Sequence, residues 1–248
     1  MSTRLEEKVA LVTGASSGIG EATAIALAAE GARVALAARR ADRLEKLVKR
    51  ILDNGGQALP IVADVADDTQ AHDMVLKAKD EFGRVDILVN NAGVMLNGPI
   101  DAADTEDWRR MVNTNVLGLM YATHAALPIM KAQGQGHIVN ISSVAGRTAQ
   151  AGSGVYNATK WGVGAFSEAL RQEVYKDKIR VTIIEPGAVA TELTDHITNS
   201  AAKERIQTWI KSLTPLESED IAAAIIYAVT QPLRVNVNEI LIRPTEQG

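Results

Sequence analysis

A tyrosine and a lysine one helical turn apart are the residues of this sequence best suited to move a proton. Tyr156 and Lys160 are spaced i, i+4, so a helix would place both side chains on one face. A lysine ammonium about 4 Å from a phenol favours the ionised phenol by roughly 4 kcal/mol at an effective dielectric of 20, before desolvation is subtracted. We therefore expect Lys160 to lower the pKa of Tyr156 and make it a usable acid/base, although such a pair taken alone is more often ordinary surface or packing.

A glycine-rich turn near the N-terminus is typical of nucleotide binding. It follows a short apolar run, precedes a helical one, and reads Thr13-Gly14-Ala15-Ser16-Ser17-Gly18-Ile19-Gly20. Gly14 permits a tight turn, Gly18 a close approach to a pyrophosphate, and Gly20 close packing of the helix on the strand. The N–H groups at the helix N-terminus would then face the phosphates, although any α/β protein can contain a glycine-rich loop. The turn predicts a dinucleotide site that includes Gly14, Ser16, Ser17, Gly18, Ile19 and Gly20.

Two arginines after the second expected strand favour NADP over NAD. An NAD site needs an acid about 20 residues after the glycines to bind the ribose hydroxyls, but Ala38 stands there and Arg39 and Arg40 follow. A guanidinium suits a 2′-phosphate through bidentate, charge-assisted hydrogen bonds, although a bare arginine pair is usually solvated. We expect Arg39 to be the first contact of the 2′-phosphate and Arg40 the second. Asp64 and Val65, after the third strand, are expected to contact adenine; the alternative for Asp64 is a helix N-cap.

Short apolar runs alternate with helix-length segments along the whole chain. We expect strands over residues 9–12, 34–36, 59–62, 87–89, 138–141, 181–184 and 240–242, and the clearest helices over 21–30, 41–54 and 67–82. Most of these strands are apolar throughout, as parallel strands covered on both faces are. The alternation predicts one Rossmann domain over residues 1–248: a doubly wound, seven-stranded parallel sheet with helices on both faces.

Composition narrows the function classes. The 248 residues carry a net charge of −4 and contain no Cys, so disulfides, zinc–thiolate sites and a Cys nucleophile are excluded. A pI of about 5.6 indicates that the protein lacks the positive electrostatic potential that attracts nucleic acid. No apolar run approaches the roughly 20 residues that cross a membrane, and the charged N-terminus lacks the apolar region of a signal peptide. The absence of Cys and of a signal peptide predicts a cytoplasmic protein. Neither His nor carboxylate residues cluster as metal ligands, so we expect no metal in the site, with a structural ion at a subunit axis left open.

Six motifs occur in an order that resembles the short-chain dehydrogenase/reductase family. They are the glycine-rich turn, Asn90-Asn91-Ala92-Gly93, Asn115 in a helical stretch, Ser143 at a strand end, Tyr156 with Lys160, and Pro186-Gly187 with Thr191. The resemblance spans residues 9 to about 244. The tail Asn238-Glu239-Ile240-Leu241-Ile242-Arg243-Pro244-Thr245 looks like a bacterial NADP-dependent subgroup that includes clavulanic-acid (clavaldehyde) dehydrogenase. Ser17 stands where some NADP-preferring members carry a basic residue, which leaves 2′-phosphate recognition to Arg39 and Arg40.

The resemblance implies a role for each matching residue. Tyr156 would be the general acid/base, Lys160 its partner, Ser143 an oxyanion donor, and Asn115 a break in its helix that holds a water behind Lys160. It also implies a substrate lid at about 188–215 and a homotetramer. The cofactor would additionally contact Asn91, Ala92, Gly93, Tyr156, Lys160, Pro186, Gly187, Val189 and Thr191.

These residues together predict an NADP(H)-dependent carbonyl reductase or alcohol dehydrogenase. It would transfer hydride between nicotinamide C4 and a small ketone, aldehyde or secondary alcohol. Two alternatives belong to other classes: a non-catalytic NADP-binding sensor, and a lyase or dehalogenase built on the same fold. A sensor would not need Tyr156, Lys160 and Ser143 together, and lyases of this fold usually lose the glycine-rich turn that this chain keeps.

Overall fold

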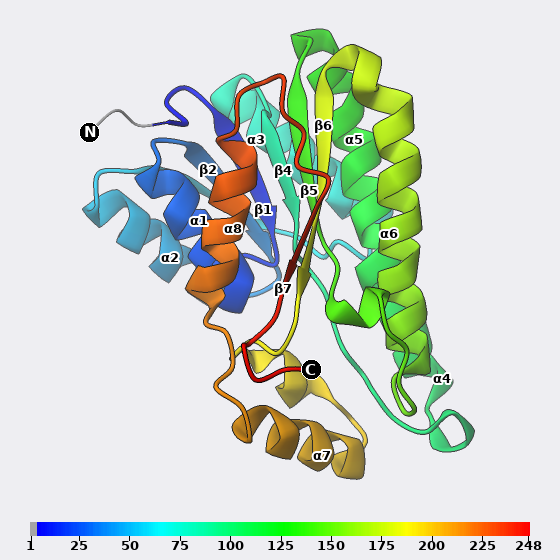
Figure 1. The fold of residues 1–248 in the computed structure, drawn as a ribbon. Coiled ribbons are helices and arrows are strands. Elements are labelled where there is room, and N and C mark those ends of the chain that lie inside the picture. The colour runs from blue at the N-terminus through cyan, green and yellow to red at the C-terminus, as the bar shows by residue number, and fades with distance from the viewer. Residues whose placement is uncertain (1–3) are drawn as a thin grey trace.

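A parallel β-sheet forms the centre of the molecule (Figure 1). The computed structural model describes residues 4–248, and within this range seven strands pair in the order β3-β2-β1-β4-β5-β6-β7, every pair parallel. The predicted single, doubly wound Rossmann domain is confirmed. The strands are β1 (Val9–Thr13), β2 (Arg33–Ala38), β3 (Gln57–Val62), β4 (Ile87–Asn90), β5 (Gly136–Ile141), β6 (Ile179–Pro186) and β7 (Glu239–Ile242).

Helices cover both faces of this sheet. Helices α1, α2 and α8 pack on one face, and α3, α5 and α6 pack on the other (Figure 1). The expected helices end at glycines with positive φ: Gly31, Gly55 and Gly83. The helices are α1 (Gly18–Ala29), α2 (Ala41–Asp53), α3 (Asp68–Phe82), α4 (Thr105–Val112), α5 (Gly118–Gln133), α6 (Gly154–Val174), α7 (Ser200–Lys211) and α8 (Ser218–Val229).

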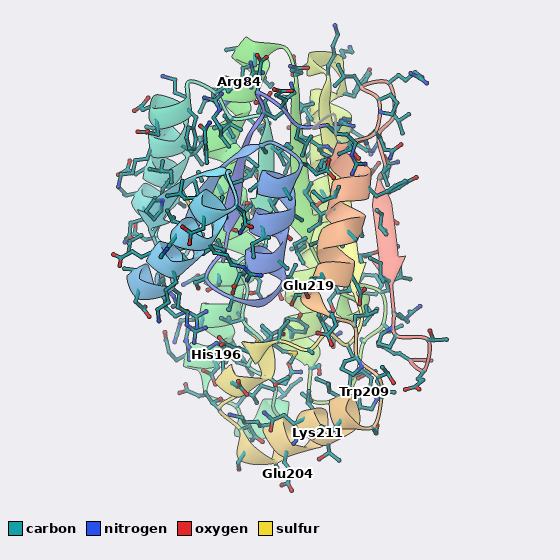
Figure 2. All side chains as sticks on the ribbon, turned by 90° about the vertical axis from the view of Figure 1, so that its left-hand side faces the viewer. Arg84, His196, Glu204, Trp209, Lys211 and Glu219 are labelled. Atoms are coloured by element: carbon teal, nitrogen blue, oxygen red, sulfur yellow. The ribbon has the colours of Figure 1, made fainter. Side chains whose placement is uncertain are left out.

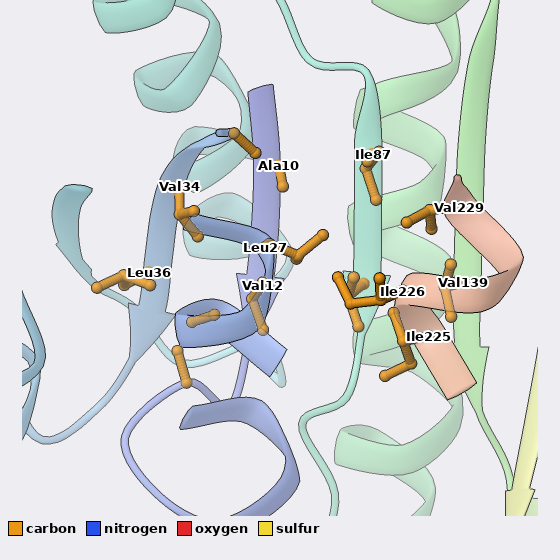
Figure 3. Close-up of a cluster of buried hydrophobic side chains, with 14 of the residues drawn as sticks. Ala10, Val12, Leu27, Val34, Leu36, Ile87, Val139, Ile225, Ile226 and Val229 are labelled. Atoms are coloured by element: carbon orange, nitrogen blue, oxygen red, sulfur yellow. The ribbon is translucent and has the colours of Figure 1, made fainter. Parts of the chain in front are cut away.

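The inner strands of the sheet are mostly apolar because they contribute to two cores. On β1, Ala10 and Val12 belong to the core under α1 and α8, whereas Leu11 belongs to the opposite core under α3 and α5. Figure 3 shows the first of these cores, where Leu27 of α1 and Ile226 of α8 meet the strands from the same side. Because all seven described strands are parallel, the loops that follow them lie along one edge of the sheet.

The carboxyl ends of the strands form the edge where the site lies. The strand order reverses between β1 and β4, the position where doubly wound sheets bind ligands. Beyond this edge lie a 3₁₀ helix, Glu192–His196, and α7. Figure 2 shows His196 on the 3₁₀ helix and Trp209 on α7 at this end of the molecule, with Arg84 at the opposite end. Within residues 4–248, no helix is long and apolar enough to cross a membrane.

Candidate active site

A cavity of about 390 Å³ opens at the carboxyl edge of the sheet. Most of the predicted site residues line it. Gly20 and Asn115 do not line it and instead support the residues that do. The predicted residues that line it are Gly14, Ser16, Ser17, Gly18, Ile19, Arg39, Arg40, Asp64, Val65, Asn91, Ala92, Gly93, Ser143, Tyr156, Lys160, Pro186, Gly187, Val189 and Thr191.

The glycine-rich turn is held in place by Asn91. The side-chain amide nitrogen of Asn91 donates hydrogen bonds to the carbonyl oxygens of Thr13 at 2.9 Å and Gly14 at 3.3 Å. Gly14 has a φ of +65°, and a Cβ there would lie 2.9 Å from the Cα of Ala92. A Cβ at Gly20 would collide with the Gly14 carbonyl. Only glycine permits this backbone path, so the turn and the segment after β4 form one rigid wall.

The two arginines at the end of β2 differ in how firmly they are held. The side chain of Arg39 is 66% exposed, and its nearest acidic partner is Asp64 at 3.6 Å. Arg40 donates from Nε and Nη2 to the Ser16 hydroxyl, at 3.0 and 2.9 Å, and from Nη2 to the Ser17 hydroxyl at 2.7 Å. The Ser17 hydroxyl therefore binds Arg40 and does not cap α1, whose first N–H groups stay available.

Tyr156 and Lys160 meet Ser143 at the floor of the cavity. Both lie near the start of α6 and are buried, at 7% and 6% exposure, and Tyr156 forms a hydrogen bond with Ser143. The Lys160 ammonium donates to the carbonyl of Ile141 at the end of β5, at 2.9 Å, and lies 5.7 Å from the centre of the Tyr156 ring. The Ser143 hydroxyl accepts from the Ala145 N–H at 3.1 Å and donates to the Pro186 carbonyl at 3.4 Å.

The expectation that Lys160 lowers the pKa of Tyr156 is wrong for this structure. Burial raises the pKa of Tyr156 to about 12, and the hydrogen bond with Ser143 opposes this only in part. Burial likewise lowers the pKa of Lys160 to about 8. Desolvation penalises both charged forms, and the ammonium contacts a backbone carbonyl, not the phenol oxygen. Tyr156 therefore keeps its proton at neutral pH, which is the form that a proton donor needs.

Asn115 lies in a π-helical turn, Asn113–Leu117, that joins α4 to α5. Its side chain accepts from the Val94 N–H at 2.8 Å and donates to the Val94 carbonyl at 2.9 Å and the Thr159 hydroxyl at 3.1 Å. It thus ties the segment after β4 to α6, which carries Tyr156. A π turn of this kind aims a side chain that a regular helix would direct elsewhere, and such turns are frequent at functional sites.

Sequence reasoning did not find two polar residues that shape the cavity. The Gln247 side chain accepts a hydrogen bond from the Ala188 N–H at 2.9 Å, so the C-terminal tail closes one wall. Glu192 lies between Arg40 and Arg43, and these guanidiniums, Arg43 first, lower its pKa to about 2. Neither residue belongs to a sequence motif, and the tertiary fold alone brings each of them to the site.

The wall around Tyr156 mixes apolar and neutral polar side chains. Apolar side chains line much of this part of the cavity, and the side-chain amide of Asn97 donates a hydrogen bond to the Ser153 hydroxyl at 2.9 Å. His196 also lines the cavity from the 3₁₀ helix. Besides Lys160 at the floor, no lysine or arginine lines this part of the cavity among the described residues. The apolar lining residues are Met95, Val144, Leu193, Ile206, Trp209 and Ile210.

Comparison with known proteins decides the family. Residues 8–202 match the model of the short chain dehydrogenase family. The chain belongs to this family. An uncharacterised oxidoreductase of Staphylococcus saprophyticus is 42% identical over 247 residues, which cover 98% of each chain. This short-chain dehydrogenase is therefore an oxidoreductase; the clavulanic-acid dehydrogenase subgroup stays a prediction.

Solved structures of short-chain dehydrogenases with this fold contain either NADP⁺ or NAD. The closed form of serine dehydrogenase complexed with NADP⁺ has a TM-score of 0.90 and 36% identity, covering 97% of this chain and 96% of that one. A short-chain dehydrogenase/reductase from Burkholderia phymatum in complex with NAD has a TM-score of 0.89 and 28% identity, covering 96% and 89%. The preference of this short-chain dehydrogenase for one cofactor must therefore be argued from its own residues.

Proposed function

We propose that this protein is an NADP(H)-dependent carbonyl reductase or alcohol dehydrogenase with Tyr156 as its general acid/base. One observation carries the proposal: a buried phenol, hydrogen-bonded to Ser143 and one turn from Lys160, lies at the floor of a cavity whose other end holds Arg39 and Arg40. A proton donor beside a hydroxyl donor suits a carbonyl oxygen that gains negative charge.

The residues of the cavity fit a phosphorylated dinucleotide. Gly14 and Gly18 both have positive φ and leave the wall without side chains where a pyrophosphate would pass. The Ser17 side chain makes no capping hydrogen bond to α1, so the first N–H groups of this helix remain available beside the same wall. Arg40 lies between the hydroxyls of Ser16 and Ser17, and no acid stands at Ala38 to bind ribose hydroxyls. These features support NADP as the preferred cofactor.

The protein's own groups would orient the carbonyl and supply its proton. A bound nicotinamide supplies the hydride or accepts it at C4. In carbonyl reduction, Tyr156 would donate its proton to the carbonyl oxygen, while the Ser143 hydroxyl holds that oxygen in place. The raised pKa of about 12 keeps Tyr156 protonated at neutral pH, which is the form that this step uses. Lys160, with a pKa of about 8, would remain mostly charged at pH 7 and keep a positive charge 5.7 Å from the centre of the Tyr156 ring.

The wall around Tyr156 supports a small or medium-sized, neutral substrate. Trp209, Ile206 and Leu193 provide apolar contact, and Asn97, Ser153 and Gln150 provide neutral polar groups. A strongly anionic substrate would need a cation beyond Lys160 on this side. The segment at about 188–215 would act as the substrate lid, and its base is tied by a bridge between Val189 and Leu216.

The decisive experiment is a reductase assay with purified protein and NADPH on a panel of diketones, ketones and aldehydes. We expect turnover that is faster with NADPH than with NADH. Tight NADPH binding without turnover on any member of the panel would favour the sensor alternative. Reversal of the NADPH preference would overturn the role given to the arginines.

We also propose that the protein forms a homotetramer. Trp161 on α6 is 52% exposed and Leu241 on the edge strand β7 is 45% exposed, and burial of such large apolar side chains favours association. Light scattering should give the mass of four chains of 26.5 kDa, and a monomer at micromolar concentration would contradict this proposal. The cytoplasmic location stays a prediction.

A further inference from the structure

A carboxylate from the lid segment lies at the arginine end of the cavity. Glu192, the first residue of the 3₁₀ helix, accepts hydrogen bonds from Nη1 of Arg43 at 2.8 Å to each oxygen and from Nη1 of Arg40 at 2.9 Å. Arg40 is the N-cap residue of α2 and Arg43 lies in its first turn, so the two side chains extend from the same end of the helix. The protein thus supplies its own anion to these two arginines.

Each nitrogen of the Arg40 guanidinium donates at least one hydrogen bond in this arrangement. Nε and Nη2 bind the Ser16 and Ser17 hydroxyls, and Nη1 binds Glu192. Arg40, Ser16, Ser17 and Glu192 all line the same cavity. A second anion that binds Arg40 must therefore share Nη1 with the Glu192 carboxylate or displace it.

The position of Glu192 is set by the residue before it. A Cβ at Gly18 would lie 3.2 Å from Cγ2 of Thr191, so the Thr191 side chain lies against the glycine-rich turn. The Thr191 hydroxyl also accepts from the Leu193 N–H at 3.4 Å and begins the 3₁₀ helix. Thr191 thereby places Glu192 at the edge of the cavity, next to the glycine-rich turn.

We infer that Glu192 is a specificity-determining residue: its carboxylate competes with the 2′-phosphate of NADP for Arg40 and thereby weakens the preference for NADP over NAD. The inference rests on the proposed function, because it assumes that Arg40 reads the 2′-phosphate. Two anions at one guanidinium repel each other, and a 2′-hydroxyl brings no such charge.

The size of the effect follows from the exposure of the pair. The side chains of Arg40 and Glu192 are 36% and 42% exposed, so solvent screens their attraction. Glu192 also has two contacts with Arg43 that do not involve Arg40. Removing the competing charge should therefore tighten NADPH binding about 1.5- to 5-fold, the range expected for one exposed ion pair.

The test compares dissociation constants of NADPH and NADH, measured by cofactor fluorescence, for wild type and Glu192→Gln. Adenosine 2′-monophosphate serves as a probe that lacks the nicotinamide. Glu204→Gln is the matched control, since it makes the same charge change on the exposed side of α7 (Figure 2). We expect Glu192→Gln to tighten NADPH and adenosine 2′-monophosphate about 1.5- to 5-fold and to leave the NADH constant unchanged, with a smaller gain in high salt.

Two results would overturn the inference. An equal change for NADPH and NADH would mean that Glu192 acts on the lid and not on the phosphate. Weaker NADPH binding would mean that Glu192 orients Arg40 for the phosphate. Arg40→Ala separates this failure from failure of the proposed function: if Arg40→Ala leaves the ratio of the two constants unchanged, Arg40 does not read the phosphate and both proposals fall. If Arg40→Ala lowers the preference but Glu192→Gln does not raise it, only the inference fails.

Discussion

Replacing Tyr156 by Phe removes one oxygen atom from the floor of the cavity and leaves the ring. The ring is buried and packs with Val94, Leu96 and Met111, contacts that Phe retains. The lost interaction is the hydrogen bond with Ser143, worth about 0.5 to 1.5 kcal/mol of net stability. The Tyr156→Phe variant should therefore fold, with a melting temperature within a few degrees of wild type, about the shift expected from 1 kcal/mol.

The expected loss of activity is much larger than the loss of stability. General acid catalysis contributes about 10²- to 10⁴-fold, so the barrier should rise by about 3 to 5 kcal/mol. Ser143 and Lys160 remain, and they can still orient a carbonyl without supplying the proton. The binding of NADPH should change by less than about tenfold, because at most one hydrogen bond is lost.

Three measurements on each variant separate these effects. The loss of NADPH absorbance at saturating cofactor gives kcat, a fluorescence titration gives the NADPH dissociation constant, and a thermal melt gives stability. Tyr227→Phe is the matched control, since it removes the same oxygen from an exposed ring on α8 and should leave all three values unchanged. If Tyr156→Phe keeps kcat within tenfold of wild type, Tyr156 is not the proton donor and the proposed chemistry is refuted.

Three further perturbations test the arginines, the lysine and the sheet. Arg39→Ala should weaken NADPH relative to NADH, but less than Arg40→Ala does, because Arg39 is more exposed; fluorescence titrations check this order. The folded-state pKa of Lys160, about 8, lies below its unfolded value of 10.5, so the unfolded chain binds more protons between these pH values. Urea unfolding should then show the stability of wild type rising relative to Lys160→Met by up to about 3 kcal/mol from pH 7.5 to 10.5, and a flat difference would contradict this assignment. Burial raises the pKa of the Asp86 carboxylate, but its bonds with Arg84 and the Val9 N–H together lower that pKa below the ordinary value. Asp86 therefore stabilises the fold above about pH 4 and loses that contribution as pH falls through the lowered pKa. Asp86→Asn should cost about 1 to 3 kcal/mol at pH 7 by denaturant unfolding and much less in strong acid.

The sequence alone determined the parts of this protein that depend on neighbouring residues. The apolar runs at residues 9–12 and 138–141 are short and bounded, so they predict buried parallel strands, and both are present in the sheet. The glycine-rich turn needs Gly14 and Gly20 because nearby backbone occupies the space of a Cβ. Tyr156 and Lys160 share a helix face because their spacing matches the helical period.

Only the tertiary structure decided how these parts meet. Glu192 contacts Arg40, which lies 152 positions away in the sequence, and Gln247 contacts Ala188, which lies 59 positions away. No local sequence pattern predicts either contact. The direction of the Tyr156 pKa also depends on the fold, because burial opposes the phenolate while the Lys160 ammonium points to the Ile141 carbonyl. Spacing along a helix shows which side chains share a face, whereas desolvation and charge pairing depend on what the rest of the chain packs against that face.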